Sequence, residues 1–208
     1  MSRVAHRTPT LSQLKLAHST FADKEARDLF YQVATELVDR AFNRTTKFSV
    51  GQAIAVLLGT WNRRFYQRGR RCDRRHVEKI DGSIEARQSE FQKYRARSIE
   101  SLRDDEQSTI QRHFAHFEPF LGRVGVAKAF HLIGPNFFPL WDNEIASEYG
   151  VPLKSPNGNA VQYWKFMVIM KADIQSLGGA AAIEKAIGTP ALKALDEYAY
   201  CRFTTGWI

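Results

Sequence analysis

The sequence predicts an all-α protein made of many short helices joined by short loops. No stretch shows the sustained alternation of polar and apolar residues that is typical of a strand. Several segments instead carry apolar residues at spacings of three and four, as one face of a helix requires. Breaks rich in Gly, Pro or Asn separate these segments. With 44% hydrophobic and 25% charged residues, the 208-residue chain has ordinary globular composition.

The first half of the chain is expected to begin with a loose arm, residues 1–22, which lacks a clear apolar period. Residues 23–208 are expected to form one helical domain, and its division into two lobes stays open. A helix is predicted from Asp23 to Phe42, and the next helix begins after Ser49, a favoured N-cap. Residues 67–82 are expected to form a basic loop, and residues 83–103 a largely polar helix.

The second half is expected to continue as short helices. A helix that carries Phe114 and Phe117 is interrupted by Pro119 and Gly122, and a short helix over residues 124–133 follows. After an apolar loop, Asp142 is expected to cap a helix that ends at residue 150. The last predicted helices cover residues 161–177, 180–187 and 190–200.

The positive charge lies almost wholly in the first half of the chain. The chain holds 30 Lys and Arg against 22 Asp and Glu, a net charge of +8, and residues 105–208 are nearly neutral. Seven arginines fall between residues 63 and 75, which favours a polyanionic partner such as nucleic acid. The plain alternative is a solvated loop after a helix. The arginines expected on a nucleic-acid backbone are Arg63, Arg64, Arg68, Arg70, Arg71, Arg74 and Arg75.

Several classes of protein are disfavoured by composition. No apolar run is long enough for a membrane span, and the N-terminus lacks the apolar region of a secretory signal. Cys72 and Cys201 are too few for a disulfide framework or an iron–sulfur cluster. We therefore expect a monomer in the cytoplasm (on the nucleoid if bacterial), with plain thiols, no metal and no cofactor.

The segment from Phe117 to Tyr149 carries the most informative pattern. A helix, a tight turn with Gly122 and Gly125 around Val124, and a second helix follow one another. Glycines allow close backbone approach, and amides at the start of the second helix point at a phosphate. The pattern predicts a helix-hairpin-helix that contacts DNA irrespective of sequence. The hairpin residues expected to do so are Gly122, Arg123, Val124, Gly125 and Val126.

Residues 121–129 (LGRVGVAKA) and 140–145 (LWDNEI) together resemble the helix-hairpin-helix DNA glycosylase superfamily, which includes endonuclease III-like and AlkA-like repair enzymes. In that family a Leu-Pro-Gly-Val-Gly hairpin precedes an apolar loop and an Asp that caps the next helix. The segment AVLLGTWN, residues 55–62, matches the place of a family helix that lines the base pocket. The resemblance covers residues 110–150 and implies a compact multi-helix, glycosylase-like fold.

The resemblance implies a hydrolase of N-glycosyl bonds that flips a damaged or modified base out of double-stranded DNA and excises it. Asp142 would stabilise the oxocarbenium-like sugar and activate water. In members that also cleave the strand, a lysine follows the second glycine by two residues, where this chain has Ala127. Lys128 is about 100° further round a helix and is expected to point away, so it is the weaker catalytic candidate. A monofunctional enzyme is therefore expected.

A flipped base needs aromatic walls and polar contacts. The candidates are Trp61, Tyr66, Phe138 and Trp141 as walls and Asn62, His131 and Asn143 as polar contacts. Most of these candidates, and the two catalytic candidates, can also be explained by a purely structural role. Trp61 continues a core-facing stripe, and Phe138 and Trp141 fit an apolar core. His131 suits a buried hydrogen-bonded site, Lys128 a phosphate contact or a solvated face, and Asp142 a simple N-cap.

Two other functions stay open from the sequence. A non-catalytic helix-hairpin-helix DNA-binding protein is favoured by Arg123 at a family glycine position and by the missing lysine. A helical domain that binds RNA or protein through its basic loop is the third. Neither the target base nor a choice between DNA repair and defence against foreign DNA has a readable local pattern.

Overall fold

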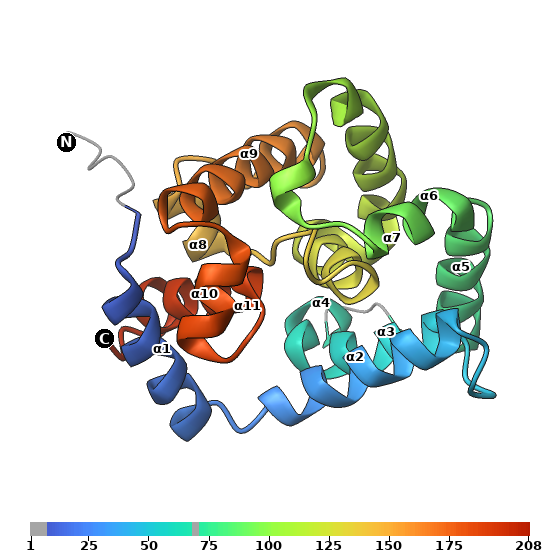
Figure 1. The fold of residues 1–208 in the computed structure, drawn as a ribbon. Coiled ribbons are helices and arrows are strands. Elements are labelled where there is room, and N and C mark those ends of the chain that lie inside the picture. The colour runs from blue at the N-terminus through green and yellow to red at the C-terminus, as the bar shows by residue number, and fades with distance from the viewer. Residues whose placement is uncertain (1–7, 68–70) are drawn as a thin grey trace.

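The computed structural model describes residues 8–67 and 71–208 and confirms the all-α prediction, with no strand among these residues (Figure 1). The helices of the first half are α1 (Leu11–Lys24), α2 (Asp28–Phe42), α3 (Val50–Trp61), α4 (Arg63–Gln67), α5 (Arg74–Glu85) and α6 (Gln88–Arg95). Two 3₁₀ turns (Ile99–Ser101 and Asp104–Glu106) lead into α7 (Gln107–Ile133). The remaining elements are α8 (Asn143–Glu148), α9 (Ala160–Ser176), α10 (Ala180–Ile187), α11 (Ala191–Ala199) and a π-helical turn (Tyr200–Thr204).

The expected N-terminal arm is wrong for the described residues, because α1 begins at Leu11. Thr10 accepts a hydrogen bond from the Gln13 amide, and the Gln13 side chain accepts one from the Thr10 amide in return. Leu14, Ala17 and Phe21 form a buried stripe, and α1 packs against α11. The arm therefore becomes helical because distant residues cover its narrow apolar face. Residues 1–7 lie outside the described part of the chain.

The predicted basic loop and polar helix also need correction. Asp73 caps α5 by accepting a hydrogen bond from the His76 amide, so the helix starts within the expected loop. It buries Ile80 and Ile84 and ends at Glu85, and α6 is a separate helix. The polar segment expected as one helix is thus divided, since its few apolar residues face different neighbours.

Helix α7 bends at the place where the sequence predicts the hairpin. Gly122 has φ 72° and ψ 160°, outside the helical region, while Pro119 and Gly125 lie within helical turns. Figure 1 shows the parts before and after the bend running in different directions. A Cβ on Gly122 would lie 2.5 Å from the Phe65 ring, so this close approach requires glycine. The tight turn therefore centres on one glycine instead of two.

The helices form two groups around the second part of α7 (Figure 1). Helix α2 packs on α3 and α3 on α5, whereas α1 and α10 pack on α11 and α9 on α7. A run of aromatic rings joins α7 to α9 and the loop before α8: Phe114, Phe117, Phe130, Phe138, Trp141 and Tyr163. Of the described helices none alone is long and apolar enough to cross a membrane, although α9 and α10, bent by 69°, pass that test as a pair by length and composition.

Candidate functional site

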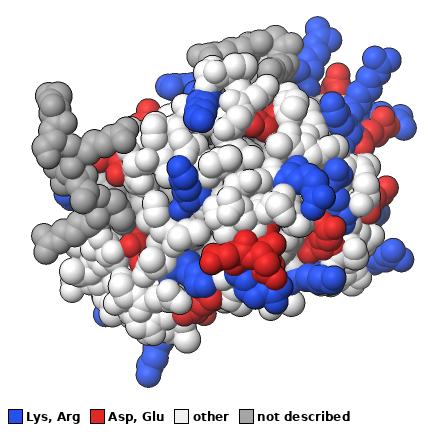
Figure 2. All heavy atoms as spheres, turned by 90° about the horizontal axis from the view of Figure 1, so that it is seen from above, with Lys and Arg blue, Asp and Glu red and all other residues white. Residues whose placement is uncertain are grey.

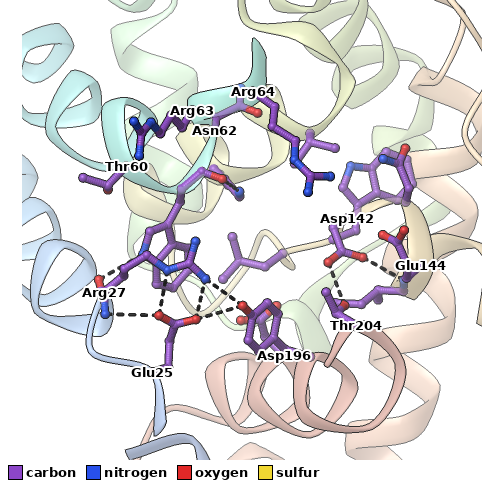
Figure 3. Close-up of a pocket in the computed structure, with 18 of the residues that line it drawn as sticks. Glu25, Arg27, Thr60, Asn62, Arg63, Arg64, Asp142, Glu144, Asp196 and Thr204 are labelled. Carbon is purple, nitrogen blue, oxygen red and sulfur yellow. Dashed lines mark hydrogen bonds and ion pairs between the residues drawn. The ribbon is translucent and has the colours of Figure 1, made fainter. Parts of the chain in front are cut away.

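A pocket of about 960 Å³ lies where the two groups of helices meet, and we call it the Asp142 pocket (Figure 3). Residues of α2, α3, α4 and α7 line one side, and residues of α1, α8, α11 and the π-helical turn line the other. Figure 3 shows Arg63, Asn62 and Arg64 on one side of the cavity and the carboxyl-bearing side chains across it. Arg27 lies beside Glu25, so the side with the carboxyl groups also carries a basic side chain.

Asp142 is the N-cap of α8, as the sequence predicts, and its side chain also lines the pocket. One carboxylate oxygen, Oδ1, accepts a hydrogen bond from the Ile145 amide at 2.8 Å. The other, Oδ2, accepts one from the Thr204 hydroxyl at 2.7 Å. These two hydrogen bonds, from α8 and from the π-helical turn, fix the position of the Asp142 carboxylate. Asp142 therefore caps α8 and lines the pocket at the same time.

Lys128 lines the same pocket, so the expectation that it points away is wrong. Val124 and Lys128 are four residues apart on α7 and share the pocket-facing side, while Ala127 is fully buried in the core. The Lys128 ammonium donates a hydrogen bond to the Trp61 carbonyl. Burial lowers the pKa of Lys128 to about 8, and the carboxylates of Asp142 and Asp196 oppose the shift. The pocket thus holds an amine close to Asp142.

The candidate base contacts divide into two sets. Trp61, Asn62, Trp141 and Asn143 line the pocket, as the glycosylase interpretation requires. Trp61 stacks one face on Tyr31 at 5.6 Å between ring centroids. Trp141 is only 1% exposed and donates its Nε1–H to the Arg123 carbonyl, so it serves mainly as core.

Tyr66, Phe138 and His131 do not line the pocket. Phe138 is fully buried among aromatic rings, and the Tyr66 hydroxyl is 3.0 Å from Nε2 of His76. His131 is also fully buried, and its Nδ1–H donates to the Phe138 carbonyl at 2.8 Å while Nε2 accepts from the Tyr31 hydroxyl at 2.9 Å. Burial lowers the pKa of His131 to about 4, so it is neutral. The plain structural interpretation holds for these residues.

The hairpin residues are held by side chains of neighbouring helices. The Asn62 amide donates to the Leu121 carbonyl at 3.3 Å, next to the Gly122 bend, and packs closely on Gly125. Arg123 donates to the Lys154 carbonyl at 2.8 Å. Gly125 and Val126 are buried, so within the hairpin only residues 122–124 retain exposed surface. The exposed part of the predicted hairpin is therefore shorter than the sequence predicts.

The arginine cluster is spread over two elements. Arg63 and Arg64 are exposed at the Asp142 pocket, and neither has an ion-pair partner among the described residues. Arg71, Arg74 and Arg75 are exposed further along, and Arg74 pairs with Glu78. Arg68 and Arg70 lie outside the described residues. Figure 2 shows Lys and Arg side chains projecting on the side where α5 and α6 lie, with acidic side chains interspersed.

Several residues that line the pocket were not predicted from the sequence, and Asp196 and Arg27 are two charged examples. Asp196 reaches the pocket from α11, and Arg27 reaches it from the turn between α1 and α2. Arg27 donates two hydrogen bonds to the Glu25 carboxylate and one to the Tyr200 hydroxyl. The only sequence signal for Asp196 is its acidic character beside apolar positions of a predicted helix.

Lys193, which packs against the pocket-lining Phe21, forms a buried centre of charge. Its ammonium is 3.0 Å from Oδ1 of Asp28 and 3.4 Å from Oε1 of Glu197. It also lies 4.1 Å from the Phe21 ring centroid and 4.7 Å from that of Tyr31. Lys193 therefore connects α1, α2 and α11. Among the described residues, no group of three or more His, Cys, Asp or Glu is placed to hold a metal ion.

Comparison with known proteins found no matching family, no matching curated protein and no matching solved structure.

Proposed function

We propose that this protein is a monofunctional DNA N-glycosylase, a hydrolase that excises a damaged or modified base from double-stranded DNA. The observation that carries the proposal is that Asp142 and Lys128 line one large pocket together with Trp61 and Asn62. These four residues come from segments singled out by the glycosylase resemblance. The pocket volume, about 960 Å³, lies in the range of small-molecule sites and accommodates a nucleobase and its sugar.

In the proposed reaction the flipped base enters between Trp61 and the α8 side of the pocket. As the glycosidic bond breaks, positive charge develops on the sugar, and the Asp142 carboxylate stabilises it. Asp142 also accepts a proton from the water that attacks the sugar. Its two hydrogen-bond donors, the Ile145 amide and the Thr204 hydroxyl, fix the carboxylate in place.

The test is a panel of duplex oligonucleotides, each with one uracil, hypoxanthine, 8-oxoguanine or alkylated purine. Purified protein is incubated with each duplex, and abasic sites are revealed by alkaline strand cleavage. Release of one or more bases supports the enzyme. Salt-dependent DNA binding with no release from any duplex favours the alternative, a non-catalytic DNA-binding protein.

Removal of two pocket-rim arginines is expected to weaken DNA binding in a salt-dependent way. Arg63 and Arg64 are free of ion pairs with described residues, so both side chains are available to phosphates. Each phosphate contact contributes about 0.9 to the slope of log affinity against log salt concentration. We therefore expect the Arg63→Ala, Arg64→Ala double variant to reduce the slope by about 2 in fluorescence-anisotropy titrations.

The matched control removes two arginines that already pair with exposed acids, Arg40 with Glu36 and Arg103 with Asp105. Its slope should stay at the wild-type value. An unchanged slope in the Arg63→Ala, Arg64→Ala variant would show that these two arginines do not contact DNA.

Lys128 provides a separate test of the monofunctional assignment. Its amine is engaged by the Trp61 carbonyl, and with a pKa of about 8 it is mostly protonated at pH 7, so it is a poor nucleophile. We expect no covalent protein–DNA adduct when borohydride is added to the reaction. An adduct that disappears in Lys128→Ala would show that the amine attacks the sugar, and the enzyme would then also be a lyase.

A further inference from the structure

Four residues with carboxyl groups line the Asp142 pocket, Glu25, Asp142, Glu144 and Asp196, and the surroundings of Asp196 differ from those of Asp142. Asp196 lines the pocket from α11, and Figure 3 shows it between the Glu25–Arg27 pair and Asp142 with Thr204. Among the described residues, no hydrogen bond or ion pair involves its carboxyl group. Asp142, in contrast, accepts hydrogen bonds from two donors. Asp142 and Asp196 thus lie in one cavity but differ in whether neighbouring groups donate hydrogen bonds to their carboxyl groups.

The charges around Asp196 come from several elements. Lys128 of α7 and Lys193 of α11 favour its carboxylate, whereas Asp142 of α8 and Glu197 of α11 oppose it. Tyr31, Tyr149 and Cys201 face it from α2, the end of α8 and the π-helical turn, and each is neutral at pH 7 because burial raises its pKa. Burial outweighs the two lysines and raises the pKa of Asp196 to about 7. A large part of the molecules therefore carries this carboxyl in its neutral form at physiological pH.

We infer that Asp196 is the general acid of the pocket and protonates the departing base. The inference rests on the proposed glycosylase function. It names the source of the proton that the departing base takes up, since Asp142 only accepts a proton from water. Paired acids with different environments commonly divide the acid and base roles in this way. Asp196 would thus be a catalytic residue in contact with the base, and Asp142 would face the sugar.

The step balances in atoms and charge. The bond between the sugar C1′ and the base nitrogen breaks, and its electron pair goes to the base. The Asp196 carboxyl gives its proton to the base, which leaves neutral. The oxygen of one water molecule bonds to C1′, and the proton that this water loses goes to Asp142. Exchange with solvent then returns a proton to Asp196 and removes one from Asp142.

The first test is the pH dependence of single-turnover base release on a duplex that the wild-type protein cleaves. With a neutral leaving base, the wild-type rate should fall about tenfold per pH unit above pH 7, because the acid form of Asp196 is lost. Asp196→Asn should lower the rate at pH 7 about 100-fold and abolish the alkaline decline. Asp196→Glu should restore part of the rate at pH 7 and part of the decline at alkaline pH. As a control, Glu184→Gln, which changes an exposed acid on α10, should have the rate and the pH profile of the wild type.

A cationic base gives a second readout that a purely structural role would not produce. 7-Methylguanine already carries a positive charge and leaves as a neutral molecule without a proton from the protein. If the pocket accepts it, Asp196→Asn should slow its release less than tenfold. An equal loss on neutral and cationic bases, or an unchanged pH profile, would overturn the inference and leave the glycosylase proposal standing.

The third readout does not depend on activity. In ¹³C NMR titration of the carboxyl groups of the free protein, one Asp should titrate near pH 7 and should be missing in Asp196→Asn. Titration of Asp196 near its ordinary value of 3.8 would contradict its role as the acid. If this signal is present but no duplex loses a base, the proposed function fails while the assignment of a neutral Asp196 holds.

Discussion

Asp142→Asn is expected to lower the single-turnover rate of base release at least about a thousandfold, or about 4 kcal/mol of transition-state stabilisation. The substitution removes the negative charge that faces the developing sugar cation. It keeps the side-chain oxygen that accepts the Ile145 amide hydrogen bond, so the α8 cap is preserved. The loss should therefore lie in the rate, with DNA affinity within about threefold of the wild-type value and thermal stability nearly unchanged.

A matched control is available on the same helix. Glu148 lies in the last turn of α8, exposed and outside the pocket, so Glu148→Gln removes one charge without touching the site. It should retain the wild-type rate. Base release that continues at the wild-type rate in Asp142→Asn would assign Asp142 to capping alone.

Lys193→Met is expected to lower the free energy of unfolding by about 3–5 kcal/mol. The substitution keeps the apolar contacts of the side chain but leaves Asp28 and Glu197 without their buried cation. Two carboxylates would then lie near each other in a region of low polarity, a large cost. Urea denaturation followed by circular dichroism measures the change directly.

Neutralising the partners should reverse the loss. In the triple variant Lys193→Met, Asp28→Asn, Glu197→Gln, the lysine and both of its carboxylate partners are replaced by neutral side chains. His18, whose Nδ1 lies 2.7 Å from Oε2 of Glu197, is partly exposed. Most of the stability should return. Lys185→Met, an exposed lysine of α10, is the control and should change stability by less than about 0.5 kcal/mol. A loss under 1 kcal/mol in Lys193→Met would show that the cluster is solvated.

The features predicted correctly from the sequence are local ones. Ser49 and Asp142 are N-caps because a short polar side chain before an apolar period satisfies free amides at the next helix. The helices after residue 160 are found nearly at their predicted bounds, since glycines and Pro190 mark their ends. The all-α class follows from the same periodicity.

The features that the sequence alone does not determine depend on contacts between distant segments. Helix α1 forms because α11 covers its apolar stripe, which is too narrow to stand out in the sequence. Lys128 faces the pocket because the Gly122 bend and the buried Ala127 set the rotation of the second part of α7. The rotation of about 100° between residues 127 and 128, used to predict that Lys128 points away, assumes a straight helix and does not include this bend. Asp196 becomes a pocket residue only when α7, α8 and α11 are arranged around one cavity.

The charge distribution also has a clearer meaning in three dimensions. The first half of the sequence holds the excess positive charge, but Arg63 and Arg64 lie at a pocket to which the second half contributes Asp142 and Asp196. Both halves therefore contribute to one site. The arginines suit the DNA backbone, and the acids suit the chemistry at the sugar and base.

The most direct measurement is mass-spectrometric detection of free base after the wild-type protein and Asp142→Asn are incubated, at equal DNA occupancy, with the modified duplex panel. The account predicts that the wild-type protein releases a base from at least one duplex and that the variant releases none above background over the same time. Binding of DNA by the wild-type protein without release of any base would contradict it.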